Sequence, residues 1–162
     1  MLAAGLQTIA KSAFMALFLL LPLAATADEP VRFGEESLTI ETASGRQHVF
    51  QVEVAATPEQ RARGLMFRNA MDKDRGMLFD FGETRRVTMW MKDTPLPLDM
   101  LFIEADGGIH RIVERTVPYS EAIIDSHGPV KYVLELNGGQ AAELGIAAGD
   151  RVFSKRIGAE GD

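Results

Sequence analysis

Residues 48–54 carry the clearest pattern of the chain, because apolar side chains occupy every second position there. This period of two predicts a strand with one face in the core and the other in water. Residues 38–42 are predicted to pair with it across a turn at residues 43–45, which end in glycine. Residues 28–36 mix acids, proline and glycine, and we expect them to form a loosely attached lead-in.

Further short apolar segments follow without long helices between them, and a turn at residues 106–108 is expected to join two of them as a hairpin. This succession predicts a mainly β fold, a small antiparallel barrel-like or sandwich domain with one or two short helices. The segments cover residues 76–81, 87–91, 98–103, 109–117, 132–136 and 151–154.

Two short helices are predicted from their capping residues. Thr57 precedes a proline and stands three residues before Gln60, which is typical of a helix start, and a glycine at position 64 ends that helix. Asn137 is the expected cap of a second helix that ends at Gly145. Residues 157–162 are expected to fray.

Residues 1–27 have the layout of a secretory signal: Lys11 precedes an apolar run of about ten residues that ends in Ala-Thr-Ala. The run is too short to span a bilayer, so we expect cleavage before Asp28 and no stable membrane insertion afterwards. The alternative is an uncleaved anchor. Cleavage leaves residues 28–162 as a single globular β domain, with a core at about 38–154, in the periplasm or outside the cell.

Charge and cysteine content exclude several classes of function. The chain has 17 basic and 23 acidic residues, and removing Lys11 with the signal leaves 16 against 23, a net charge of −7. An acidic chain lacks the electrostatic footprint of a nucleic-acid-binding protein. The absence of cysteine removes disulfides, thiolate metal sites and cysteine nucleophiles. We expect no cofactor and no nucleic-acid partner.

Four motifs follow one another along the chain: TPEQRARGLMFR at 57–68, GMLFDF at 76–81, MWMKDTPLPLDMLF at 89–102, and VLELN at 133–137 followed by Gly149-Asp150. With these motifs the chain resembles the bacterial and archaeal family known as domain of unknown function 192. The resemblance covers nearly all of residues 38–153. It implies a mainly β, barrel-like or sandwich fold with one or two short helices, and it implies no activity.

Trp90, the only tryptophan, is the main candidate for ligand binding. It shares a strand face with Thr88 and Lys92, which are polar, so the pattern directs it toward solvent or beneath a loop. An indole beside fixed polar groups suits a sugar ring or a peptide. The alternative is a core residue covered by the loop at 69–75. The predicted ligand-binding residues are Trp90, Lys92, Asp93, Thr94 and Arg68.

Asp99 and Glu135 interrupt strands that are otherwise apolar. A pair of carboxyl groups in one cleft can serve as the general acid and base of a hydrolase, and these two are the candidate catalytic residues. The alternative is that each is held by an arginine or by the backbone amides of a loop, or that its strand face is solvated. The arginine partners considered are Arg61, Arg63 and Arg68.

Met89 and Met91 are candidate ligands for Cu(I), because thioether sulfur is a soft ligand and both residues lie on one strand face. That face is wholly apolar, which favours core packing. The three histidines are too far apart in sequence to form a recognisable metal motif.

These observations favour an exported module that binds a glycan, a peptide or another small molecule at its surface. The alternatives are a hydrolase acting on an envelope or extracellular substrate through Asp99 and Glu135, a purely structural or protein-interaction role, and Cu(I) binding through methionine. No catalytic signature is present in the sequence, so we favour binding over catalysis.

Overall fold

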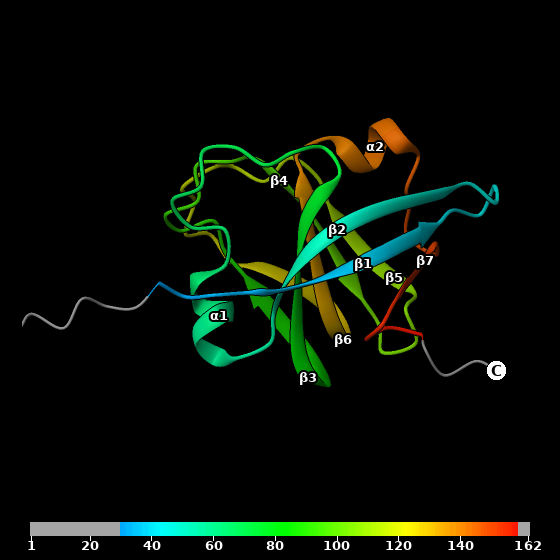
Figure 1. The fold of residues 1–162 in the computed structure, drawn as a ribbon, viewed down its shortest axis with the longest axis horizontal. Coiled ribbons are helices and arrows are strands. Elements are labelled where there is room, and N and C mark those ends of the chain that lie inside the picture. Colours follow the sequence, from blue (N-terminus) through cyan, green and yellow to red (C-terminus); the bar gives the residue numbers. More distant parts are fainter. Residues whose placement is uncertain (1–29, 159–162) are drawn as a thin grey trace, which may run out of the picture.

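The computed structural model describes residues 30–158, and the expected signal segment lies outside them. These residues form one seven-stranded sheet that curls into a half-barrel, with two short helices (Figure 1), so the predicted mainly β, barrel-like fold is confirmed. In the sheet the strands follow the order β5-β4-β6-β3-β2-β1-β7. Their bounds are β1 Gly34–Glu41, β2 Gln47–Ala55, β3 Arg75–Met89, β4 Leu98–Ile103, β5 Ile109–Val113, β6 Ile124–Asn137 and β7 Arg151–Ser154.

Neighbouring strands are antiparallel except β2 and β3, which run parallel. Parallel neighbours need a crossover connection, and here it contains helix α1 (Pro58–Arg63) and a loop. This crossover lies over one face of the curled sheet, where it forms one side of the site described below (Figure 1).

The two edges of the sheet meet through the turn before β5. The amide of Val152 donates to the carbonyl of Gly107 at 2.8 Å, and the amide of Ile109 donates to the carbonyl of Asp150 at 2.9 Å. Gly107 has a φ of 93°, and a Cβ added there would lie 2.3 Å from the Val152 carbonyl oxygen. Only glycine fits this approach, because both the backbone conformation and the space exclude a side chain.

Two strands are longer than the sequence pattern predicts. The segments at 76–81 and 87–91 belong almost wholly to the single strand β3, and the segment at 132–136 is the end of β6. The exposed residues 82–86 look like a turn in the sequence because they lack apolar side chains. They stay in the strand because β3 pairs with β6 both before and after them. The register of this pairing shifts between Asp80 and Arg85 and again between Arg86 and Thr88.

The first predicted helix is confirmed and the start of the second is corrected. At α1 the Thr57 hydroxyl accepts from the Gln60 amide, and the Gln60 side chain accepts from the Thr57 amide in return. Helix α2 (Gln140–Leu144) begins after Gly139. Asn137 does not cap it, because Asn137 ends β6 and donates its side-chain amide to the carbonyls of residues 71 and 72.

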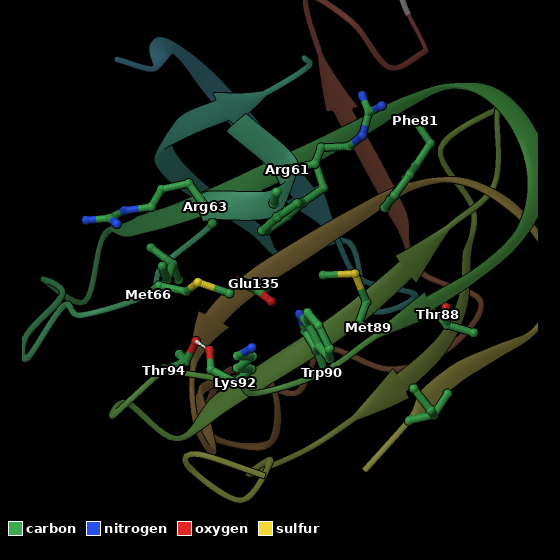
Figure 2. Close-up of a pocket in the computed structure, with 15 residues that line it drawn as sticks. Arg61, Arg63, Met66, Phe81, Thr88, Met89, Trp90, Lys92, Thr94 and Glu135 are labelled. Atoms are coloured by element: carbon green, nitrogen blue, oxygen red, sulfur yellow. Dashed lines mark hydrogen bonds between the residues drawn. The ribbon is translucent and has the colours of Figure 1, made fainter. Parts of the chain in front are cut away.

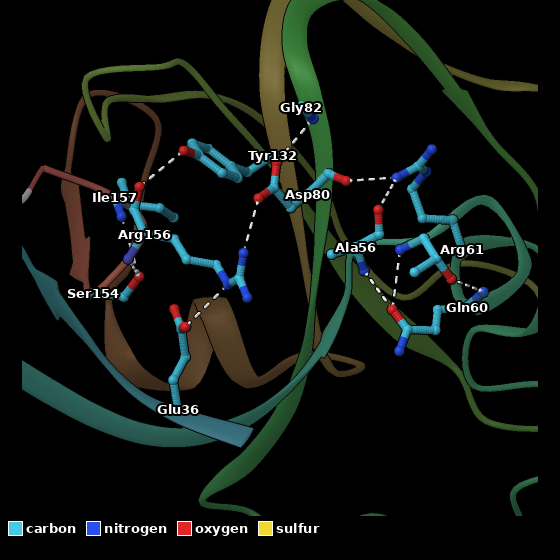
Figure 3. A network of polar contacts seen from close by, with 11 residues as sticks. Glu36, Ala56, Gln60, Arg61, Asp80, Gly82, Tyr132, Ser154, Arg156 and Ile157 are labelled. Carbon is cyan, nitrogen blue, oxygen red and sulfur yellow. Dashed lines mark hydrogen bonds and ion pairs between the residues drawn. The ribbon is translucent and has the colours of Figure 1, made fainter. Parts of the chain in front are cut away.

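The chain ends that the structure describes are more firmly attached than predicted. Strand β1 already begins at Gly34, and Glu36 forms an ion pair with Arg156, which also pairs with Asp80 of β3 (Figure 3). Ile157 is fully buried. The expectation of loose ends is therefore wrong for residues 34–36 and 157, while residues 28, 29 and 159–162 lie outside the described range.

The sheet packs a hydrophobic cluster on each face. Because side chains alternate along a strand, Leu134 and Leu136 of β6 join the cluster that α2 covers, whereas Val133 joins the cluster on the α1 side. Among residues 30–158, no helix is both long enough and apolar enough to cross a membrane. Glu135, one residue beyond Leu134, belongs to the α1 face.

Candidate functional site

A pocket of about 380 Å³ opens on the α1 face of the sheet (Figure 2). Three parts of the chain enclose it. The first is α1 and the turn that follows it, the second is the end of β3 and the residues beyond it, and the third is β6. Its lining is mostly apolar and aromatic, with cationic side chains and one carboxyl group. The lining residues are Arg61, Ala62, Arg63, Gly64, Leu65, Met66, Phe79, Phe81, Thr88, Met89, Trp90, Lys92, Thr94, Ile123 and Glu135.

Trp90 forms one wall of this pocket and is 46% exposed. Lys92 places its ammonium 5.5 Å from the centre of the indole, within the range of a cation–π interaction. The alternative interpretation, a core tryptophan covered by residues 69–75, is wrong. That loop is held at the end of β6 by Asn137 and contributes no lining residue to the pocket.

The exposure of Trp90, just after β3, agrees with the alternation that the sequence predicts for residues 87–91. Val87 and Met91 are buried, whereas Thr88 and Trp90 are exposed, as the sequence pattern predicts. Strand β3 ends at Met89, and the amide of Met91 then donates to the Ser120 carbonyl at 2.8 Å. This bond fixes the backbone on the C-terminal side of Trp90.

Glu135 lies at the floor of the pocket and is 4% exposed. On β6 it stands opposite Met77 of β3 and Met100 of β4, both fully buried. Its carboxyl group has no hydrogen bond or ion pair with any residue of the described range 30–158. Burial in these apolar surroundings raises its pKa from 4.5 to about 8, so the group is mostly protonated at neutral pH.

The pocket brings together three of the five predicted ligand-binding residues. Trp90, Lys92 and Thr94 line it, and the Thr94 hydroxyl donates to the Lys92 carbonyl at 3.0 Å. Asp93 and Arg68 are not among its lining residues. Arg68 forms an ion pair with Glu53 and stacks on Phe33 instead.

Asp99 is fully buried and is held by backbone amides. One carboxylate oxygen accepts from the amides of Arg115 and Gly139, and the other accepts from the amide of Ala141, each at 2.8 Å. This agrees with the alternative in which the backbone amides of a loop hold the carboxylate. The structure does not bring Asp99 and Glu135 into one cleft, as a pair of catalytic carboxyl groups requires.

None of the three arginines considered as partners neutralises Asp99 or Glu135. Arg61 donates to the carbonyls of Ala56 and Asp80 and so ties α1 to the sheet (Figure 3). Arg63 stacks on Phe67 at 4.9 Å from the ring centre, and Arg68 pairs with Glu53. Sequence proximity to a turn suggested these pairs, but the turn directs the side chains elsewhere.

The structure also separates the two candidate copper ligands. Met91 is fully buried, and its sulfur accepts from the Thr116 hydroxyl at 3.1 Å. Met89 is half-buried and lines the pocket, and the second methionine that lines it is Met66, not Met91. Figure 2 shows the thioethers of Met66 and Met89 entering the pocket from two sides. Within residues 30–158, no cluster of three or more His, Asp or Glu side chains could hold a metal ion.

The sequence predicts Arg61 and Arg63 only as partners of Asp99 or Glu135, and it gives no sign that other pocket residues form a site, namely Ala62, Gly64, Leu65, Met66, Phe79, Phe81 and Ile123. Phe79 and Phe81 alternate with Asp80 in the motif at 76–81, which signals a shared face. The sequence holds no signal that this face meets Ile123, because that contact depends on how β6 pairs with β3. Glu135 was singled out in sequence, but as a catalytic candidate.

Comparison with known proteins identifies the family. The model of the DUF192 family, described as uncharacterized ACR, matches residues 39–154. The chain belongs to the DUF192 family. The resemblance seen in the sequence motifs is thereby confirmed. A search of curated proteins finds no match.

Two solved structures share this fold at high sequence identity. One is a proposed transcription regulator from Sinorhizobium meliloti 1021, 56% identical, with a TM-score of 0.78, covering 79% of this chain and 99% of that one. The other, a protein of unknown function from Novosphingobium aromaticivorans DSM 12444, is 41% identical with a TM-score of 0.70. That match covers 72% of this chain and 83% of the other.

Proposed function

We propose that this DUF192 protein is an exported binding module that holds a small organic molecule, a peptide or a glycan in the pocket of Trp90. The observation that carries the proposal is the pairing of a half-exposed indole at the wall with a buried carboxyl group at the floor. Glu135 has no partner among the described residues, and its carboxyl oxygens keep some accessible surface in the pocket, where a ligand can form a hydrogen bond with them. A ligand that fills the pocket supplies the missing partner.

Size and composition support a ligand site. A volume of about 380 Å³ lies within the usual range of about 300–1,000 Å³ for small-molecule pockets. Aromatic and aliphatic walls with few polar groups are also typical of such pockets, since the polar groups then fix the orientation of the ligand. Binding is favoured over hydrolysis because Asp99, the second carboxyl group, is occupied by three backbone amides.

A thermal-shift screen of sugars, cell-wall fragments and short peptides tests the proposal, since a ligand that binds only the folded state raises Tm. The single tryptophan provides a second readout, because a ligand against Trp90 changes its fluorescence. Trp90→Ala should abolish the response to each hit. Phe153→Ala removes an exposed aromatic residue of β7, away from the pocket lining, and should leave the response intact.

Hits that respond equally in wild type and Trp90→Ala would contradict this site. A screen in which no compound shifts Tm or the fluorescence of Trp90 would contradict the binding function itself.

Export is a separate part of the proposal and rests on residues 1–27. The protein recovered from the envelope of its own host should begin at or near Asp28. N-terminal sequencing checks this, and a mature chain that retains Met1 would overturn it.

The S. meliloti protein is described as a proposed transcription regulator, which makes DNA binding a second candidate. The charge of this chain argues against it. The chain has 23 acidic and 17 basic residues, and DNA affinity depends on neutralising phosphates. A mobility-shift assay with duplex DNA at physiological salt should show no complex. A shifted band that disappears as salt is raised would support the regulator instead.

A further inference from the structure

We propose that the ligand of the Trp90 pocket is an N-acylated amino acid or the C-terminal end of a peptide. In this arrangement the amide of the ligand meets Glu135, its apolar side chain lies against the walls, and its carboxylate meets Lys92 at the mouth. This inference rests on the proposed binding function and names the chemical class of the ligand. Figure 2 shows Glu135, Trp90 and Lys92 around one space.

The floor of the pocket suits an amide. With its pKa raised to about 8 by burial, the Glu135 carboxyl keeps its proton at neutral pH. A protonated carboxyl group donates one hydrogen bond through its O–H and accepts another through its carbonyl oxygen. An amide offers the complementary pair, a carbonyl acceptor and an N–H donor. One ligand amide therefore satisfies the buried carboxyl group without requiring a buried charge.

The walls suit an apolar side chain more than a sugar. Leu65, Phe79 and Ile123 present no polar side-chain group to the pocket, so sugar hydroxyls placed against them would lose hydrogen bonds to water. Met66 and Met89 add flexible, polarisable side chains that adjust to irregular apolar shapes. An aromatic or branched aliphatic ligand side chain is therefore favoured over a polyhydroxylated ring.

Three cationic side chains line the pocket, although the whole chain is acidic. Lys92 is half-buried beside Trp90 and forms no ion pair with any residue in the range 30–158. Arg63 also lacks an ion pair in that range, whereas Arg61 is bound to the carbonyls of Ala56 and Asp80. Lys92 is thus the cation best placed to pair with a ligand carboxylate, with Arg63 at the outer edge.

Three related probes test the ligand class by titration of the Trp90 fluorescence and by calorimetry. N-acetyl-L-phenylalanine carries the amide, the apolar side chain and the carboxylate. N-acetyl-L-phenylalanine amide lacks the charge, and L-phenylalanine amide carries a cationic amine in place of the acyl group. We expect the first probe to bind at least about tenfold tighter than the second, the difference made by one ion pair, and the third to bind weakest.

Two variants assign the contacts. Lys92→Gln should lower the affinity for N-acetyl-L-phenylalanine about tenfold and leave that for its amide unchanged, because only the charged probe uses the ammonium. Lys73→Gln is the matched control: Lys73 is highly exposed, pairs with Glu143 and does not line this pocket. It should leave both affinities unchanged.

Glu135→Gln tests whether the side chain at position 135 contacts the ligand as a neutral hydrogen-bonding group or as a negative charge. Glutamine also offers one donor and one acceptor group, so we expect the variant to bind N-acetyl-L-phenylalanine within about threefold of wild type at pH 7. In wild type the affinity should fall about tenfold between pH 7 and pH 9.5, as Glu135 loses its proton and repels the ligand carboxylate. The other ionisable residues that line the pocket are Arg61, Arg63 and Lys92. The pH response should be absent in Glu135→Gln.

Tighter binding of L-phenylalanine amide than of N-acetyl-L-phenylalanine would overturn the inference, since Glu135 would then act as the counter-ion of an amine. An affinity for N-acetyl-L-phenylalanine that does not change with pH would also overturn the inference.

Either result leaves the proposed binding function standing if binding of the probe is still lost in Trp90→Ala. Failure of all three probes, together with sugars that bind in a Trp90-dependent way, would overturn the ligand class alone. If nothing in either set binds, both proposals fail.

Discussion

Asp99 of β4 and Glu135 of β6 lie on neighbouring strands, yet their carboxyl groups leave the sheet on opposite faces. The register places Asp99 opposite Leu136 and Met100 opposite Glu135, so the two acids are offset by one residue. Because side chains alternate along a strand, an offset of one residue sends them to different clusters. The Asp99 carboxylate is surrounded by amide donors, whereas the Glu135 carboxyl group is surrounded by apolar side chains that favour its protonated form.

Asp99→Asn should destabilise the fold by about 2 to 5 kcal/mol, the usual cost of breaking a buried charged interaction. Asparagine keeps one acceptor oxygen, but it turns the second acceptor into a donor. If the retained oxygen serves Arg115 and Gly139, the new amide faces the N–H of Ala141. Urea unfolding measures the loss.

The exposed residue Asp74 offers a matched control, since Asp74→Asn makes the same chemical change at the surface. It should alter the free energy of unfolding by no more than about 0.5 kcal/mol. If Asp99→Asn also stayed within that margin, the three backbone hydrogen bonds would not be anchoring the loops.

Stability should fall as pH rises from about 5 to 7.5 through the titration of Glu135. Its pKa is raised to about 8 in the folded state, so folded Glu135 holds a proton that the unfolded chain releases near pH 4.5. The folded state therefore binds more protons, and the free energy of unfolding decreases with pH by about 3 kcal/mol over this range before levelling off above pH 8.

Glu135→Gln should remove this contribution, because glutamine does not titrate. The stabilising effect of the substitution should therefore be larger at pH 8 than at pH 5, as measured by urea unfolding at both values. Equal stability differences at the two pH values would show that Glu135 is ionised in the folded protein.

Trp90 should behave as an accessible residue. With 46% of it exposed, we expect a red-shifted emission maximum, efficient quenching by acrylamide, and a loss of about 1 kcal/mol in Trp90→Ala. A blue-shifted, unquenched emission together with a loss of about 3 to 5 kcal/mol, the usual cost of truncating a core aromatic, would place the indole in the core instead.

Gly107→Ala should weaken the contact that joins the two edges of the sheet. The added methyl group would lie 2.3 Å from the Val152 carbonyl oxygen at a φ that alanine rarely adopts, so we expect a loss of about 2 kcal/mol or more. Gly34→Ala is the control, because apart from the two residues adjacent in the chain no atom lies within 4 Å of its Cβ position. Equal stability of the two variants in thermal unfolding would argue against this role for Gly107.

The Met89 and Met91 pair should not form a Cu(I) site, because the Met91 sulfur is buried and accepts from Thr116. We expect a Cu(I) titration under reducing conditions to give the same curve for wild type and for Met89→Leu with Met91→Leu. Tight binding that this double substitution abolishes would restore the copper hypothesis.

The sequence by itself determined the features that depend on neighbouring residues. Helix α1 begins where Thr57 and Gln60 can cap each other three residues apart, and this contact needs no other part of the chain. The exposure of Trp90 could be predicted because it shares a period of two with the polar residues Thr88 and Lys92. The family motifs likewise predicted a mainly β, barrel-like fold.

Only the tertiary structure decided what the two buried acids do. The amides that hold Asp99 lie 16, 40 and 42 residues away along the chain, and no local pattern specifies them. Glu135 became the floor of a pocket because β6 lies between β3 and β4 while α1 covers that face. Strand pairing sets which distant residues meet, and it depends on the packing of the whole sheet. For that reason the sequence pointed to both carboxyl groups, and the fold gave them separate roles.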